Sequence, residues 1–248
     1  DKNGEAKVPR IAIRMNGKTK IGEIRGIADN QNMEPEMMSI LEEKLKEFPD
    51  RDKYLKKEHD MKLLTLIDKK VNNNIELTLD ELKFLYEIDG KIDGFGYIKD
   101  PRIKEIKSKR NCKKEFAYLF NSKEEEVALS QEEWESNPEK FKFLLDDLHL
   151  SRITNADGLT LPRYIYGDLI LDNLISANEL VLPQHVGGSL SLDRLEYADR
   201  LVFPQHVGGD LSLDSLRRAD GVVLPKYVGD NLYLYKLYLA KMKIYKLN

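Results

Sequence analysis

The chain has 248 residues, of which 41% are hydrophobic and 33% are charged, and its formal net charge is -3. This composition is typical of an ordinary globular protein and indicates no general affinity for polyanions. No window approaches the run of about 18 apolar residues that a membrane-spanning helix needs. The single cysteine, Cys112, excludes a disulfide framework within the chain and a cysteine-rich zinc site, so we expect a reducing, cytoplasmic setting.

Two patterns near the amino terminus predict a β-hairpin and then a helix. Residues 10–26 alternate apolar and polar side chains on both sides of Asn16-Gly17, a frequent signal for a tight hairpin turn. After Asn32, a candidate N-cap, apolar residues recur at helical spacing until Pro49, where we expect the helix to stop. The periodic residues are Met37, Met38, Leu41, Leu45 and Phe48.

The rest of the amino-terminal half carries several helix signals. A second helix is predicted over residues 51–71 from its apolar face. Four helix-start signals follow, each a capping-box pair or a proline in the first turn. They are Thr78 with Glu81, Asp100-Pro101, Ser130 with Glu133, and Asn137-Pro138. We therefore predict an α+β protein in which residues 1–146 form a mainly helical domain with a β-hairpin.

The segment EIDGKIDGFGYIKD, residues 87–100, matches part of a calcium-binding loop. Asp89, Asp93 and Gly94 stand at the first, fifth and sixth positions of such a loop. However, Lys91 occupies a position that requires a ligand oxygen, and Asp100 replaces the bidentate glutamate. These differences favour a glycine-rich connection over a calcium site, and we predict no metal and no cofactor.

Residues 99–114 carry eight lysines and arginines but only two acidic residues. Such a concentration of positive charge is typical of a nucleic-acid-binding surface. The alternative is a solvated helix face, because no aromatic residues interleave the basic ones as in single-strand binders. The candidate nucleic-acid-binding residues are Arg102, Lys104, Lys107, Lys109, Arg110, Lys113 and Lys114.

The carboxy-terminal part of the chain repeats with a period of 21 residues. Prolines mark the period at Pro162, Pro183, Pro204 and Pro225, and four apolar columns keep the same register. These columns begin at Leu169, Leu171, Leu174 and Ala177. Each repeat holds two short strand-like pieces that cannot bury their own leucines, so successive coils must stack. We predict a β-solenoid with a carboxy-terminal cap over residues 147–248.

The consensus LPxxVGGxLxL resembles bacterial leucine-rich-repeat-like arrays over about residues 147–240. This resemblance implies an architecture and no particular activity. Leucine stands at positions 174, 195 and 216, where the asparagine ladder of typical leucine-rich repeats would fall, so the handedness stays open. The amino-terminal half is similar to uncharacterised bacterial proteins that share VPRIAIRM, FLYEID and GFGYIKDPRI, which implies no known activity.

The motif HVGG occurs twice at the same phase of the repeat. Its glycines precede strands, which indicates a corner that needs positive φ or close backbone approach, and not a phosphate loop. His185 and His206 should stack on adjacent coils, with Tyr164 and Tyr227 at the same place in the flanking coils. Because no third ligand is evident, this column is interpreted as a surface ladder and not as a metal site.

A second ladder is acidic. Asp172, Asp193 and Asp214 recur at the repeat spacing, and we expect them to face water because stacked carboxylates repel each other. Such a stripe could recognise a basic partner, and the tyrosines of the last coil are reasonable contact residues. The candidate partner-binding residues are Asp172, Asp193, Asp214, His185, His206, Tyr233 and Tyr235.

No nucleophile, positioned base and oxyanion donor converge on a recognisable motif, and no base is visible beside Cys112. We therefore predict a non-catalytic protein–protein interaction module or scaffold that presents a solenoid face to an unidentified protein partner. The alternative is a nucleic-acid-associated protein that uses residues 99–114. Because the chain begins at Asp1 and opens directly into a strand-like segment, we expect a fragment of a larger bacterial protein with no membrane partner.

Overall fold

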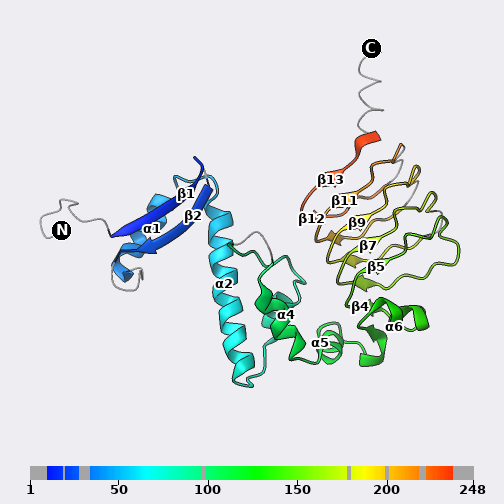
Figure 1. The fold of residues 1–248 in the computed structure, drawn as a ribbon, viewed down its shortest axis with the longest axis horizontal. Coiled ribbons are helices and arrows are strands. Elements are labelled where there is room, and N and C mark those ends of the chain that lie inside the picture. The colour runs from blue at the N-terminus through cyan, green and yellow to red at the C-terminus, as the bar shows by residue number, and fades with distance from the viewer. Residues whose placement is uncertain are drawn as a thin grey trace, which may run out of the picture. The chain divides into compact units, whose positions relative to one another are not determined.

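A computed structural model describes residues 10–18, 20–27, 34–95, 99–177, 180–198, 201–217 and 222–236. The chain divides into two compact units. The first comprises Asp1–Leu77 and Ile92–Ile106, and the second comprises Thr78–Lys91 and Lys107–Asn248 (Figure 1). The second unit therefore contains both the solenoid and a helix that precedes it by many residues. None of the described helices is long and apolar enough to cross a membrane.

The first unit is built on a two-stranded antiparallel hairpin and its neighbouring helices. Its elements are β1 (Ile11–Asn16), β2 (Lys20–Gly26), η2 (Pro35–Met37), α1 (Met38–Leu45) and α2 (Arg51–Asn72). The predicted hairpin and both helices are confirmed. Asn16 pairs with Lys20, and Gly17 adopts φ 75° between them, a conformation that suits glycine. The candidate N-cap Asn32 lies outside the described residues.

A small core joins the hairpin to the helices of this unit. Ile21 of β2, Leu41 and Leu45 of α1, and Tyr54 of α2 are buried together. The side chain of Asp50, just before α2, accepts a hydrogen bond from the backbone of Ile21 at 2.7 Å. The helix α1 ends at Leu45, and Phe48 packs against this core from beyond its end.

Five short helical elements follow: α3 (Leu79–Leu85), α4 (Pro101–Ser108), α5 (Cys112–Leu119), η3 (Glu124–Glu126) and α6 (Gln131–Ser136). The predicted capping box is confirmed, because Thr78 and Glu81 each accept a hydrogen bond from the other's backbone amide. The prediction of a helix after Asn137-Pro138 is wrong. Residues 138–140 form a turn, and the chain then enters a parallel sheet, whose pairing overrides the local helix signal.

The solenoid consists of two parallel sheets, and each coil from β4 onwards contributes one strand to both of them (Figure 1). The six-stranded sheet contains β3 (Val127–Ala128), β4 (Phe143–Leu144), β6 (Tyr164–Ile165), β8 (His185–Val186), β10 (His206–Val207) and β12 (Tyr227–Val228). The five-stranded sheet contains β5 (Leu148–His149), β7 (Leu169–Ile170), β9 (Leu190–Ser191), β11 (Leu211–Ser212) and β13 (Leu232–Tyr233). From β4 onwards in the first sheet and throughout the second, paired residues lie 21 positions apart, as the predicted period requires.

The core of the solenoid is a set of leucine columns between the two sheets. Leu169, Leu190 and Leu211 are fully buried and pair in register, and Leu174 and Leu195 are also fully buried. The α+β architecture with a carboxy-terminal β-solenoid is therefore confirmed. The parallel pairing already includes β3 and β4, which precede residue 147.

The glycines of the HVGG motifs allow the coils to approach each other closely. A Cβ atom at Gly208 would overlap the carbonyl oxygen of Gly187 in the preceding coil, and one at Gly229 would overlap that of Gly208. The described glycines with positive φ are Gly17, Gly90 and Gly158, which lie outside the motifs. Of the two predicted reasons for these glycines, close backbone approach is the one that applies.

Candidate functional site

The outward side of the six-stranded sheet carries a continuous stack of rings. We call Tyr164, His185, His206 and Tyr227 the His–Tyr column; each begins one strand from β6 to β12. The successive ring centres lie 4.2, 4.3 and 4.5 Å apart, and neighbouring planes are within 14° of parallel. The predicted stacking of the two histidines between two tyrosines is confirmed.

This column is covered at one end and open at the other. Tyr164 is only 3% exposed because Phe116 and Phe120, from α5 and its carboxy-terminal end, pack against its ring. Tyr227, at the other end, is 43% exposed. The interpretation as a surface ladder therefore holds only for the later coils. The two histidines are half-buried, between the buried Tyr164 and the exposed Tyr227.

Burial disfavours the charged form of both imidazoles. It lowers the pKa of His185 to about 3, with a smaller contribution from His206. Burial also lowers the pKa of His206, although the nearby carboxylate of Asp89 opposes this shift. The Nε2 atom of His185 and the hydroxyl of Tyr164 are buried without a hydrogen-bond partner in the described part of the chain.

The segment that follows α3 contacts both early and late coils of the solenoid. The hydroxyl of Tyr166, in the coil of β6, donates a hydrogen bond to Glu87 at 3.0 Å. Four residues later, the ammonium of Lys91 forms an ion pair with Asp230 of the last described coil at 2.5 Å. Residues 87–91 therefore connect coils that lie far apart along the solenoid, on the side of the His–Tyr column.

The outward side of the five-stranded sheet is different in character. We call it the Ser–Asp face, after the row Ser191 and Ser212 and the neighbouring row Asp172, Asp193 and Asp214. Each serine hydroxyl donates a hydrogen bond to the aspartate of the preceding coil, Ser191 to Asp172 and Ser212 to Asp193. These bonds hold the carboxylates in place, and in the described chain no lysine or arginine forms an ion pair with the three aspartates.

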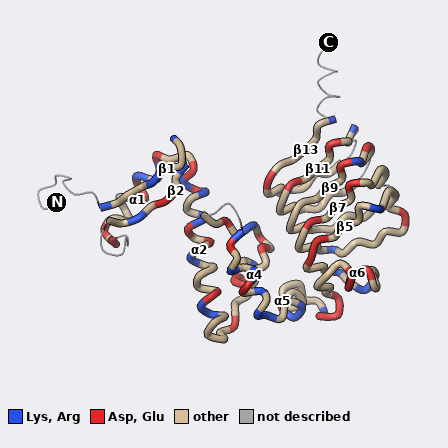
Figure 2. The backbone as a smooth tube through the Cα atoms, in the orientation of Figure 1, with Lys and Arg blue, Asp and Glu red and all other residues tan. Residues whose placement is uncertain are grey.

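A further row of side chains lies just ahead of the same strands. Asp147 accepts a hydrogen bond from the amide of Asp168 in the next coil at 2.8 Å, and Asp168 accepts one from Ser189 at 2.6 Å. Asp210 likewise accepts a bond from the amide of Asn231 at 2.8 Å. The sequence analysis missed this row, although the 21-residue spacing of its aspartates was a visible signal. Together the rows give the coils a recurrent acidic edge (Figure 2).

The candidate tyrosines lie at the end of this face. Tyr233 belongs to β13 and is 44% exposed, and Tyr235 follows it with 64% exposure. The amide of Tyr235 donates a weak hydrogen bond, 3.5 Å long, to Asp214 of the preceding coil. The structure therefore brings Tyr233, Tyr235 and the three aspartates onto one side of the solenoid. It places the two histidines on the other sheet.

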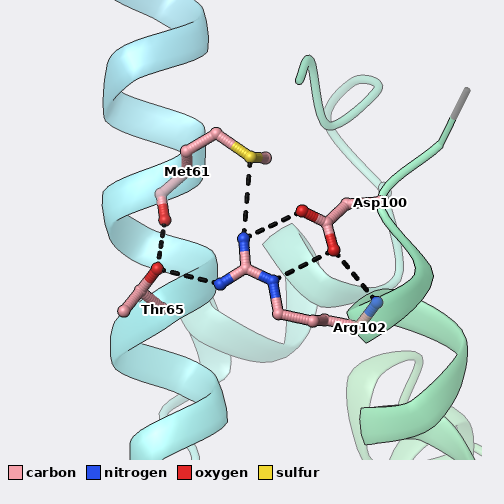
Figure 3. A network of polar contacts seen from close by, with 4 residues as sticks. All are labelled: Met61, Thr65, Asp100 and Arg102. Carbon is pink, nitrogen blue, oxygen red and sulfur yellow. Dashed lines mark hydrogen bonds and ion pairs between the residues drawn. The ribbon is translucent and has the colours of Figure 1, made fainter. Parts of the chain in front are cut away.

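The basic segment is largely engaged in internal contacts. In the first unit, Arg102 donates hydrogen bonds to both carboxylate oxygens of Asp100 and to the hydroxyl of Thr65, and its guanidinium also lies 3.8 Å from the sulfur of Met61 (Figure 3). Thr65 in turn donates to the carbonyl of Met61 at 2.8 Å. The hydrogen bonds from Arg102 lower the pKa of Asp100. Arg102 therefore fastens the start of α4 to α2.

The remaining basic candidates lie on α4, on α5 and in the turn between these two helices. Arg110 forms an ion pair with Glu115 at 2.5 Å, Lys113 pairs with Glu133, and Lys107 donates to the hydroxyl of Tyr166. Lys104, Lys109 and Lys114 are exposed. The helix break was missed in the sequence analysis; Asn111 caps α5 by accepting a hydrogen bond from the amide of Lys114.

The residues of the calcium-like segment have other partners. Lys56 of α2 forms ion pairs with Asp60 at 2.7 Å and with Asp93 at 3.0 Å. Asp89, by contrast, belongs to the second unit. Within the described ranges, no group of three or more His, Cys, Asp or Glu side chains could hold a metal ion.

Comparison with known proteins adds no family. No protein-family model, no curated protein and no solved structure matches the chain. The solenoid assignment therefore depends on the strand pairing and burial described above.

Proposed function

We propose that this protein is a non-catalytic interaction module or scaffold, and that the Ser–Asp face is the surface it presents to a protein partner. The partner chemistry that suits this face is a segment rich in lysine and arginine. The relationship to bacterial leucine-rich-repeat-like arrays belongs to the same proposal, as do the lack of catalytic activity and a cytoplasmic setting.

The observation that carries the proposal is the fixed arrangement of the carboxylates. Asp172 and Asp193 are each held through one oxygen by a serine hydroxyl, so the rows lose little conformational freedom when a partner binds. Rows of carboxylates that form no ion pair with lysine or arginine in the described chain also accelerate association with a partner of opposite sign. Exposed tyrosines at the end of the face supply the kind of side chain that contributes most to protein interfaces.

The test is selection of random 12-residue peptides displayed on phage against the full chain, followed by binding assays with synthetic copies. We expect lysine- and arginine-rich peptides that bind the wild type and bind Asp172→Asn/Asp193→Asn/Asp214→Asn at least about tenfold more weakly, because charge complementarity is lost. Asp52→Asn/Asp80→Asn, which removes two exposed carboxylates elsewhere in the chain, is the control for a general change in charge. Peptides that bind the triple variant unchanged, or no enrichment, would contradict the proposal.

The alternative function, nucleic-acid binding through residues 99–114, has weaker support. Arg102, Arg110 and Lys113 each have an acidic partner, and the segment is divided between the two units. Lys104, Lys109 and Lys114 are the exposed lysines among the candidate residues of this segment. Fluorescence-anisotropy titration of a 30-nucleotide DNA, single- and double-stranded, against the full chain and Lys104→Glu/Lys109→Glu/Lys114→Glu tests this. Salt-sensitive binding that disappears in the variant would favour the alternative.

A further inference from the structure

The pair His185 and His206 is the least expected feature of the His–Tyr column. The two rings stack at 4.3 Å with planes 4° apart, and their strands β8 and β10 are hydrogen-bonded neighbours. Two positive charges at this distance repel strongly when they are shielded from water. The stack is therefore incompatible with a positive charge on both rings at once.

The surroundings of the pair give little compensation for a proton. The aromatic rings of Tyr164 and Tyr227 cover the two outer faces of the pair. The charged groups that face the column come from the segment after α3. The carboxylate of Asp89 interacts electrostatically with His206, and the carboxylates of Asp89 and Glu87 interact in the same way with Tyr164. The Nε2 atom of His185 is buried without a partner among the described residues, so a proton there would be a buried, uncompensated charge.

We propose that the stacked His185–His206 pair is a pH-sensitive element, and that uptake of protons by the pair separates the coils of β8 and β10 in mildly acidic solution. His206 takes the first proton because it is less deeply buried and lies near Asp89. The second proton, on His185, would be opposed by both burial and the first charge. The inference does not depend on the identity of a partner.

The direction of the pH effect follows from the difference between folded and unfolded chains. An unfolded His185 has its ordinary pKa of 6.5, whereas burial lowers the value in the folded chain to about 3. The unfolded chain therefore binds the proton more readily below pH 6.5, and stability falls as the pH decreases from 6.5 towards 3. Between pH 7 and pH 5, His185 alone raises the unfolding equilibrium constant by about 25-fold.

The chain itself offers the matched substitution. Tyrosine already occupies this position in the coils on both sides, so His185→Tyr/His206→Tyr extends the column with a residue it accepts. Urea unfolding of the full chain at pH 7 and pH 5 gives the change in the unfolding equilibrium constant. We expect this change to be at least about 25-fold greater in the wild type than in the double variant. His149→Tyr, an exposed histidine on the other sheet, should keep the wild-type pH dependence. Equal pH dependence of the wild type and the double variant would overturn the proposal.

Hydrogen exchange locates the effect within the solenoid. The amides of Gly208 and Gly229 donate to Val186 and Val207 at 2.9 Å, beside the column. Their protection, corrected for the intrinsic exchange rate, should fall at pH 5 more than that of Leu171, which bonds within the other sheet. An equal fall at all three amides would overturn the localised mechanism.

A measurement on the wild type covers the case in which the double variant does not fold. The proton resonances of the His185 imidazole, followed by NMR from pH 7.5 to pH 4.5, should stay at their neutral positions while the chain is folded. A folded chain in which His185 titrates above pH 6 would overturn the proposal, because the pair would then accept protons without cost.

Discussion

The two sheets of the solenoid are built from the same 21-residue coils but differ in what their outward sides contain. The six-stranded sheet presents rings that stack on one another and are partly covered by α5. The five-stranded sheet presents serines and aspartates whose hydrogen bonds run from coil to coil. Each repeat therefore supplies one side of stacked rings and another side of hydrogen-bonded serines and carboxylates. We infer that substitutions on the two sides will have unequal effects.

The largest effect is expected from the glycines that allow close stacking beside the His–Tyr column. Gly208→Ala places a methyl group against the carbonyl oxygen of Gly187, and backbone cannot move aside as a flexible side chain can. We expect a loss of about 3 kcal/mol in the free energy of unfolding, measured by urea titration at pH 7. Gln205→Ala, at an exposed position of the same coil, is the control and should change little. A loss below about 1 kcal/mol for Gly208→Ala would show that the coils can separate at small cost.

A smaller effect is the difference in stability loss between two leucines of one column, one in an earlier coil and one in a later coil. Leu190 is fully buried, whereas Leu232, two coils later and in the same register, is 43% exposed. Leu190→Ala should cost about 3 kcal/mol because it leaves a cavity, and Leu232→Ala should cost about 1 kcal/mol. Thermal or urea unfolding of the two variants compares them directly. Equal losses would mean that the last described coil is as well packed as the coil of β9.

The smallest effect on stability is expected on the Ser–Asp face. In Asp172→Asn/Asp193→Asn/Asp214→Asn, each amide oxygen can still accept the hydrogen bond that Asp172 and Asp193 receive from serine. Each substitution should change the free energy of unfolding by less than about 0.5 kcal/mol, although relief of charge repulsion favours the variant. Urea unfolding checks this. A loss above about 2 kcal/mol would assign these carboxylates to the stability of the fold instead of to contact.

The solenoid could be predicted because its prolines and leucines recur at a constant spacing of 21 residues. One buried leucine predicts little, but Leu169, Leu190 and Leu211 at constant separation require stacked coils. Local capping signals were equally informative, since the Thr78–Glu81 box depends on neighbouring residues alone. The predicted stacking of His185 and His206 followed from the same period.

Features that depend on contacts between distant segments could not be predicted in this way. The helix expected after Asn137-Pro138 is replaced by a turn because Phe143 pairs with Val127 across the sheet. The burial of Tyr164 depends on Phe116 and Phe120, whose positions have no relation to the repeat. The internal contacts of Arg102 likewise depend on α2, whose contacting residues are about 40 positions away in the sequence. Sequence periodicity predicts local structure and gives no information about such a contact.

The ion pair between Lys91 and Asp230 joins residues 139 positions apart. A ribosome releases Lys91 long before Asp230, so this contact cannot form until all the coils between the two residues have been synthesised. The coils can stack one after another as they emerge, because each pairs with its predecessor. The segment at residues 87–91 therefore completes its contacts only after Asp230 has been synthesised, when Tyr166 and the coils between them are already present.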